Sequence, residues 1–131
     1  MLPINKENIL NLVENAPLDP AVGIQICCLW EDINKSYFAS SIAPNKKIAP
    51  HFHNEGDELY FIVNGKGIMR LGIPLSTDVK WIQEFEINTG DFFTVPPKTV
   101  HQLINNSDDN LLAVFGCNKN HLSTDRTVLN I

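Results

Sequence analysis

Apolar residues near the N-terminus recur with a helical period, whereas most of the remaining chain alternates apolar and polar residues. The helical stripe follows the i, i+3, i+4, i+7 spacing of one helix face: Ile9, Leu12, Val13 and Ala16. It predicts one short helix, with Asn5 as its N-cap and its end before Pro17. We expect this stripe to pack against the main body of the protein.

From Val22 onward the period changes to two, which is typical of strands with one buried face. Clusters of Asn, Asp, Gly and Pro separate the alternating runs and predict turns. The predicted strands lie near Gly23–Trp30, Ser36–Ile42, Lys47–His53, Glu58–Val63, Gly67–Ile73, Val79–Ile87, Asp91–Val95, Val100–Asn105 and Leu111–Cys117. Short strands at near-regular spacing, without a second helical segment, indicate an all-β sandwich or barrel.

No linker, repeat or charge run divides the 131 residues, so we expect a single domain over residues 1–131. Within it we expect a helix and arm over 1–20, a β-barrel over about 21–118 and a polar tail over 119–131. His121 in that tail matches no motif, and we expect it to be exposed. Phe92 and Phe93, in contrast, are expected in the core.

The charge balance excludes some partners. Ten Lys and Arg stand against fifteen Asp and Glu, a net charge of −5, so we expect neither nucleic acid nor anionic membrane as a partner. No apolar run approaches the length of a membrane span, and the first residues lack the apolar stretch of a signal peptide. Three cysteines without a CxxC pair indicate no disulfide framework, and a cytoplasmic location is the simplest interpretation.

Histidines and a glutamate are placed where strands would bring them together. His51 and His53 are two residues apart and therefore share one face of a strand. The turn sequence 54–57 leads back through Glu58, which we expect beside the histidine pair on a neighbouring strand. His101 begins a later strand. Imidazole and carboxylate groups on stiff strands suit a divalent ion of the first transition row.

These residues belong to two longer runs. The run H-x-H-x4-E-x6-G is met by His51, His53, Glu58 and Gly65, and the run G-x5-P-x4-H-x3-N by Gly90, Pro96, His101 and Asn105. Both runs resemble the two motifs of the cupin superfamily. The resemblance implies a small, jelly-roll-like β-barrel of the cupin type with a short N-terminal helix. It also implies that His51, His53, Glu58 and His101 bind one divalent metal ion, whether Fe, Mn, Ni, Co, Cu or Zn.

The chain departs from the family pattern at three places. Asn45 stands where a glycine is usual, and because Asn tolerates the left-handed conformation we expect that turn to survive. Lys98 stands where a glycine often follows the prolines, so either the loop differs in shape or the ammonium points toward the barrel mouth. The stretch 71–87 is longer than in the tightest members, which predicts an extended hairpin tip at Pro74–Asp78.

Two functions follow from the resemblance. The first is a mononuclear metal-dependent enzyme that acts on a small polar organic molecule, of the dioxygenase, decarboxylase, lyase or isomerase type. Its candidate catalytic residues are Glu58, Tyr60, Lys98 and Gln102. The second is a non-catalytic metal-containing module that binds or senses a small molecule. Tyr60 fits the core as well as the cavity, and Gln102 also fits a structural role in the sheet.

The resemblance also implies that two copies of the chain form a homodimer. Gly23–Trp30 is an alternating segment that could lie at the edge of the sheet, where an unpaired strand can accept a second copy. We therefore expect this segment to be the pairing edge.

Overall fold

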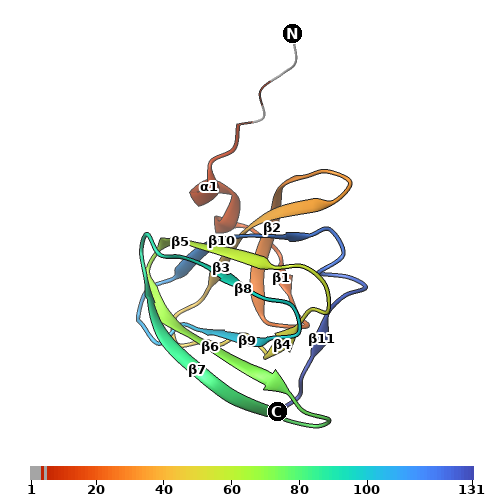
Figure 1. The fold of residues 1–131 in the computed structure, drawn as a ribbon. Helices are drawn as coiled ribbons and strands as arrows, with labels where there is room; N and C mark the ends of the chain where they lie inside the picture. The colour runs from red at the N-terminus through yellow and green to blue at the C-terminus, as the bar shows by residue number, and fades with distance from the viewer. Residues whose placement is uncertain (1–3, 5) are drawn as a thin grey trace.

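The structure is a computed structural model that describes residue 4 and residues 6–131. Its strands form two facing antiparallel sheets (Figure 1). In chain order its elements are α1 (Ile9–Glu14), β1 (Leu18–Asp19), β2 (Ile24–Glu31), β3 (Lys35–Ile42), β4 (His51–Phe52), β5 (Glu58–Asn64), β6 (Lys66–Pro74), β7 (Val79–Asn88), β8 (Phe92–Val95), β9 (Val100–Ile104), β10 (Leu111–Asn118) and β11 (Thr127–Val128). The prediction of an all-β barrel with a short N-terminal helix is confirmed.

The strands form a six-stranded sheet in the order β1-β2-β3-β10-β5-β8 and a five-stranded sheet in the order β11-β4-β9-β6-β7. Each predicted strand has a counterpart, although the stretch Lys47–His53 narrows to β4, with only a single bridge between Lys47 and Ile104 before it. The two-residue strands β1 and β11 were not predicted, because two residues carry no readable period. β6 and β7 form the expected long hairpin.

The short helix begins later than the sequence indicated. Its N-cap is Asn8, whose side-chain oxygen accepts a hydrogen bond from the backbone N–H of Asn11 at 3.1 Å. The prediction of Asn5 as the cap is therefore wrong, and Asn5 itself lies outside the described residues. Through Val13, α1 packs on Ala39 and Leu112, on the outer face of the six-stranded sheet.

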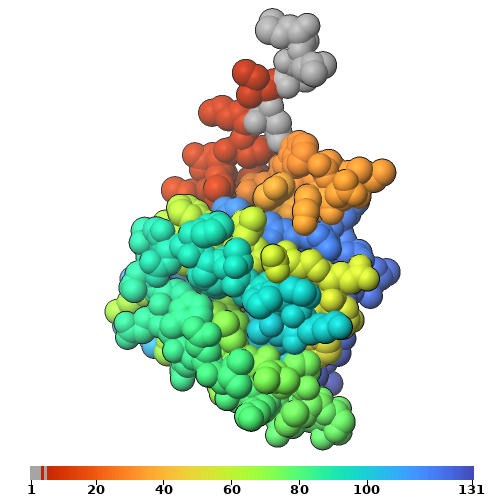
Figure 2. Space-filling view, in the orientation of Figure 1, coloured from red at the N-terminus to blue at the C-terminus, as the bar shows by residue number. Residues whose placement is uncertain are grey.

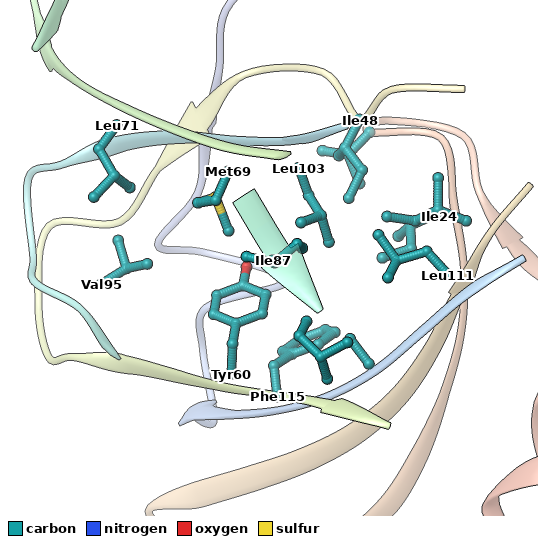
Figure 3. Close-up of a cluster of buried hydrophobic side chains, with 14 of the residues drawn as sticks. Ile24, Ile48, Tyr60, Met69, Leu71, Ile87, Val95, Leu103, Leu111 and Phe115 are labelled. Atoms are coloured by element: carbon teal, nitrogen blue, oxygen red, sulfur yellow. The ribbon is translucent and has the colours of Figure 1, made fainter. Parts of the chain in front are cut away.

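Alternation along the strands sends one set of side chains into the space between the sheets. On β5 the buried residues are Glu58, Tyr60 and Ile62, and in Figure 3 Tyr60 rises from its sheet toward Met69 of the facing sheet. The same alternation shows that the expectation of both Phe92 and Phe93 in the core is wrong for Phe92. Phe92 is 62% exposed, because β8 directs Phe93, and not its neighbour, against the core.

The turns that frame the two motifs depend on left-handed backbone. Gly65 and Gly90 have φ of 109° and 93°, a region that glycine enters without steric cost. Asn45 has a φ of 58°, so the turn survives without glycine as expected. Lys98 has a φ of 59° and an exposed side chain, and its backbone N–H donates to the carbonyl of His53 at 2.6 Å. The loop therefore keeps its left-handed residue with lysine in place of glycine.

Residues 119–131, called the C-terminal segment below, pack against the barrel. β11 pairs with β4, so that Val128 lies opposite His51. Arg126 forms a largely buried ion pair with Asp19 at 2.7 Å. His121 is 0% exposed, so the prediction of an exposed tail histidine is wrong. Its position depends on contacts with residues far away in the sequence, which local patterns do not record.

The predicted pairing edge is only partly open. β1 pairs with the first residues of β2, Ile24 and Gln25, and a bulge between Cys28 and Trp30 interrupts the far half. The hairpin of β2 and β3, orange in the space-filling view, projects from the body of the molecule (Figure 2). Among the described residues no helix is long and apolar enough to cross a membrane. Pairing of two copies through β2 stays a prediction.

Candidate metal centre

Three imidazoles meet at one end of the barrel interior. His51 on β4 lies directly across from His101 on β9, with ring centroids 4.3 Å apart. His53, one residue beyond β4, lies 5.4 Å from the first ring and 5.5 Å from the second. All three side chains are buried, and one nitrogen from each ring lies within 4.8 Å of the others. The structure thus brings together the three histidines that the sequence singled out.

The backbone fixes which nitrogen of each ring faces the interior. Each Nδ1 lies against a carbonyl oxygen: His51 with Ala49 at 2.9 Å, His53 with Asp125 at 2.6 Å and His101 with Thr99 at 3.1 Å. Because a carbonyl oxygen only accepts, Nδ1 carries the proton, and Nε2 of the neutral ring presents a lone pair. Nε2 of His53 and Nε2 of His101 are buried without a hydrogen-bond partner.

The protonation state of the rings follows from their surroundings. Burial lowers the pKa of His51 to about 3, and the neighbouring His101 lowers it as well. Burial also lowers the pKa of His101. Both rings are therefore neutral at neutral pH, which is the state in which imidazole binds a metal ion.

Glu58 adds a charged carboxylate from the facing sheet. The expectation that it lies on a strand neighbouring the histidine pair is wrong, because β5 pairs with β10 and β8, and Glu58 reaches the histidines across the barrel interior. Its Oε2 lies 2.9 Å from Nε2 of His53, and its Oε1 lies 3.9 Å from Nε2 of His101. Burial on its own raises the pKa of this carboxyl, but the adjacent His121 and His53 side chains outweigh burial and hold the pKa well below its usual range. A charged carboxylate and three imidazole nitrogens thus lie together inside the protein. These groups are ligands that divalent ions of the first transition row take, so the donor set fits such an ion.

A fourth buried histidine, which the sequence reasoning missed, lies on the other side of Glu58. Nδ1 of His121 is 3.5 Å from Oε2 of Glu58, and the ring stacks on His53 with centroids 4.1 Å apart and planes 4° from parallel. Its Nε2–H donates to the carbonyl of Glu55, 66 positions earlier in the chain. No motif or strand period marks His121, and no local signal in the sequence would have identified it.

Two of the other candidate residues take different roles. Tyr60 is buried, stacks on Phe93 with ring centroids 5.1 Å apart, and has its ring 6.2 Å from that of His101. Burial and the Glu58 carboxylate raise the pKa of Tyr60 well above its usual range, so its hydroxyl keeps its proton. The exposed side chain of Lys98 contributes no buried group to the centre.

Gln102 uses both ends of its amide within the sheet. Its Nε2 donates to the carbonyl of Ile48 at 3.0 Å, and its Oε1 accepts from Arg70 at 3.3 Å. Asn105 likewise donates to three backbone carbonyls, among them that of Ile42 at 3.0 Å. Both amides therefore serve the barrel rather than the centre.

A cavity of about 480 Å³ opens where β7 and β8 form the free edges of the two sheets. It is lined by Leu71, Ile82, Gln83, Phe85, Phe93, Thr94, Pro96 and Thr99. Two of these residues adjoin the centre: Thr99 accepts the hydrogen bond from His101, and Leu71 lies across from His101 in the sheet. The cavity is mainly apolar, and its lining residues Thr99 and Leu71 adjoin His101.

Two facing antiparallel sheets that enclose histidines and a glutamate define a β-barrel protein with a potential metal centre. The family model of the cupin domain matches residues 39–116, from β3 to β10. The chain therefore belongs to the cupin family.

The chain is similar to a curated protein and to several solved structures. The uncharacterized protein MJ1618 of Methanocaldococcus jannaschii is 33% identical over 77 residues, which cover 59% of this chain and 54% of that protein. The chain thus matches about half the length of this relative. A conserved protein of Klebsiella pneumoniae with a double-stranded β-helix domain has a TM-score of 0.70 at 14% identity, over 98% of this chain and 100% of its own. The cupin-2 domain protein Rru_A2000 of Rhodospirillum rubrum has a TM-score of 0.67 at 14% identity, over 82% of this chain and 66% of its own. The structural likeness supports the fold.

Proposed function

We propose that the chain binds one divalent first-row metal ion through His51, His53, Glu58 and His101. The observation that carries this proposal is the pair of buried Nε2 atoms, on His53 and His101, that have no hydrogen-bond partner and lie near a charged carboxylate. Leaving such atoms unpaired costs about 1–3 kcal/mol each, so a fold that keeps them gains no stability from them. Binding of a cation gives each lone pair a partner.

We further propose that the centre acts on a small organic molecule that carries oxygen groups. A bound ion of this kind polarises a carboxylate, carbonyl or hydroxyl oxygen. The protein holds the imidazoles by their Nδ1 hydrogen bonds, and Glu58 supplies negative charge. Tyr60 offers a protonated hydroxyl in the interior, and the cavity between β7 and β8 admits the apolar part of the molecule. An enzyme of the dioxygenase, decarboxylase, lyase or isomerase type is our first choice.

Metal binding is tested with protein purified without a tag and equilibrated with Mn²⁺, Fe²⁺, Co²⁺, Ni²⁺ or Zn²⁺. We expect about one ion per chain in the wild type. His51→Ala and His101→Ala should lose most of it, while Ser40→Ala, an equally buried change outside the centre, should retain it. Wild-type protein that keeps none of these ions, or histidine variants that keep as much as wild type, would refute the proposal.

A binding module without turnover is the second candidate function. Two observations on the described residues of the centre favour it. Tyr60 keeps its proton, and the amide of Gln102 is hydrogen-bonded within the sheet, so neither residue is placed to accept a proton from a substrate. The metal-loaded protein is screened with hydroxy acids, keto acids, diols and sugars, with oxygen uptake and products both followed. Conversion that Glu58→Gln slows supports the enzyme, whereas tight binding without conversion in air or nitrogen supports the module.

A further inference from the structure

We propose that the C-terminal segment completes the candidate metal centre, with His121 and Asp125 acting as positioning residues that hold Glu58 and His53. This inference rests on the proposed metal binding and extends it to residues outside both sequence motifs.

His121 contacts two of the four proposed ligands without being placed to act as a fifth. Its ring is parallel to that of His53, with centroids 4.1 Å apart and planes only 4° from parallel. One ligand atom each of His53, Glu58 and His121 lies within 4.8 Å of the others, but the lone pair of an imidazole nitrogen lies in the plane of its ring, so two parallel stacked rings are poorly placed to direct their lone pairs at one ion. His121 instead supports the face of His53, and its Nδ1 lies 3.5 Å from Oε2 of Glu58.

Asp125 holds the start of the turn that joins His53 to Glu58. Its backbone carbonyl accepts the Nδ1 hydrogen of His53 at 2.6 Å. Its carboxylate accepts the backbone N–H groups of Asn54 at 2.8 Å and Glu55 at 3.0 Å. One residue thus sets the orientation of a ligand ring and anchors the turn that leads to the next ligand.

The segment is itself attached to the barrel outside the centre. Arg126 forms its ion pair with Asp19 next to β2, and the N–H of Leu129 donates to the carbonyl of Pro50 at 2.9 Å. Anchors on both sheets keep His121 and Asp125 at a fixed distance from the strands that carry the ligands. Because His121 is 0% exposed and its Nε2 binds the carbonyl of Glu55, its ring has one defined position.

The test compares Co²⁺ binding by His121→Phe, His121→Asn and Thr124→Ala with the wild type. Phe keeps a ring for stacking but removes both nitrogens, Asn keeps a polar side chain that can form a hydrogen bond, and Thr124 is an exposed residue of the same segment. We expect His121→Phe to weaken Co²⁺ affinity about 10- to 100-fold and to shift the visible Co²⁺ absorption bands. His121→Asn should recover part of both effects, and Thr124→Ala should match the wild type.

The melting temperature in excess chelator separates positioning from general stability. If His121→Phe melts lower but binds Co²⁺ with wild-type affinity and spectrum, His121 is merely structural and this inference is wrong. Should that variant not fold, Asp125→Asn is judged by the same affinity and spectrum. Wild-type protein that binds no Co²⁺, or that keeps it after His101→Ala, would instead refute the proposed metal binding.

Discussion

The two ends of the barrel interior are built by the same strands but hold opposite kinds of side chain. β5 begins with buried Glu58 and continues to buried Ile62, and β9 runs from buried His101 to buried Leu103. One end is a closed apolar core, and the other gathers imidazoles, among which Nε2 of His53 and Nε2 of His101 are buried without a hydrogen-bond partner. Strand alternation decides that a residue points inward, and its position along the strand decides which end it joins.

The two ends contribute oppositely to the free energy of unfolding. A fully buried Ile or Leu, such as Ile62 or Leu111, contributes about 1.5–3 kcal/mol through the hydrophobic effect. Each unpaired Nε2 at the histidine end costs about 1–3 kcal/mol. The apolar end therefore stabilises the barrel that holds the histidines in place. A bound ion would make the contribution of the histidine end to the free energy of unfolding favourable as well.

The strongest test of this division removes a side chain from the apolar end. Leu111→Ala should lower the free energy of unfolding by about 2–5 kcal/mol, because the side chain is 0% exposed and leaves a cavity. Metal affinity of the folded fraction should stay within a factor of two or so of wild type. Urea unfolding of chelator-treated protein measures the free energy of unfolding, and titration with metal measures the affinity. A large loss of affinity in this variant would show that the two ends are coupled.

Loading and removing the ion tests the histidine end alone. At a free metal concentration of 100 times the dissociation constant, the ion should add about 2.7 kcal/mol to the free energy of unfolding. Excess chelator should abolish this gain in the wild type, and His101→Ala should show no gain. An unchanged melting temperature on removal of an ion shown to be bound would contradict the linkage.

Acid should weaken the apoprotein through the histidine end. The pKa of His51 is about 3 in the folded state and near 6.5 when unfolded, so between these values the unfolded chain binds one more proton. Stability contributed by this residue is present above pH 6.5 and falls by about 1.4 kcal/mol per pH unit below it. The lowered pKa of His101 acts in the same direction. The raised pKa of His121 instead gives stability that is lost as pH rises above 6.5.

His51→Phe isolates this effect in chelator-treated protein. Its free energy of unfolding should fall less steeply than that of wild type between pH 6 and pH 4, whereas Leu111→Ala should keep the wild-type slope. Urea unfolding at several pH values measures the slopes. Equal slopes for His51→Phe and wild type would remove His51 as a source of acid sensitivity.

The smallest expected effect concerns the anchor of the C-terminal segment. Arg126→Gln breaks the ion pair with Asp19 and should cost about 1 kcal/mol, because both side chains are largely but not fully buried. Asp19→Asn should cost a similar amount, and the double variant should cost less than the sum. Additive costs in this double-mutant cycle would show that the pair does not hold the segment.

Much of the fold and of the candidate centre could be read from local patterns. The period of two placed the main strands, because alternation is dictated by the pleat and needs no knowledge of partners. The same period aligned His51 with His53, and the short turn after them returned Glu58 to their side. Asn45 kept its turn because a single residue determines whether a left-handed position is tolerated.

The remaining features depend on pairings between distant parts of the chain, and only the tertiary structure decided them. Phe92 is exposed because β8 lies at the edge of its sheet with the neighbouring phenylalanine turned inward. Gln102 is committed to the sheet by a carbonyl 54 positions away. His121 is buried beside Glu58 because the C-terminal segment folds back onto β4. Local spacing carries no record of such contacts, since they are selected by the packing of the whole barrel.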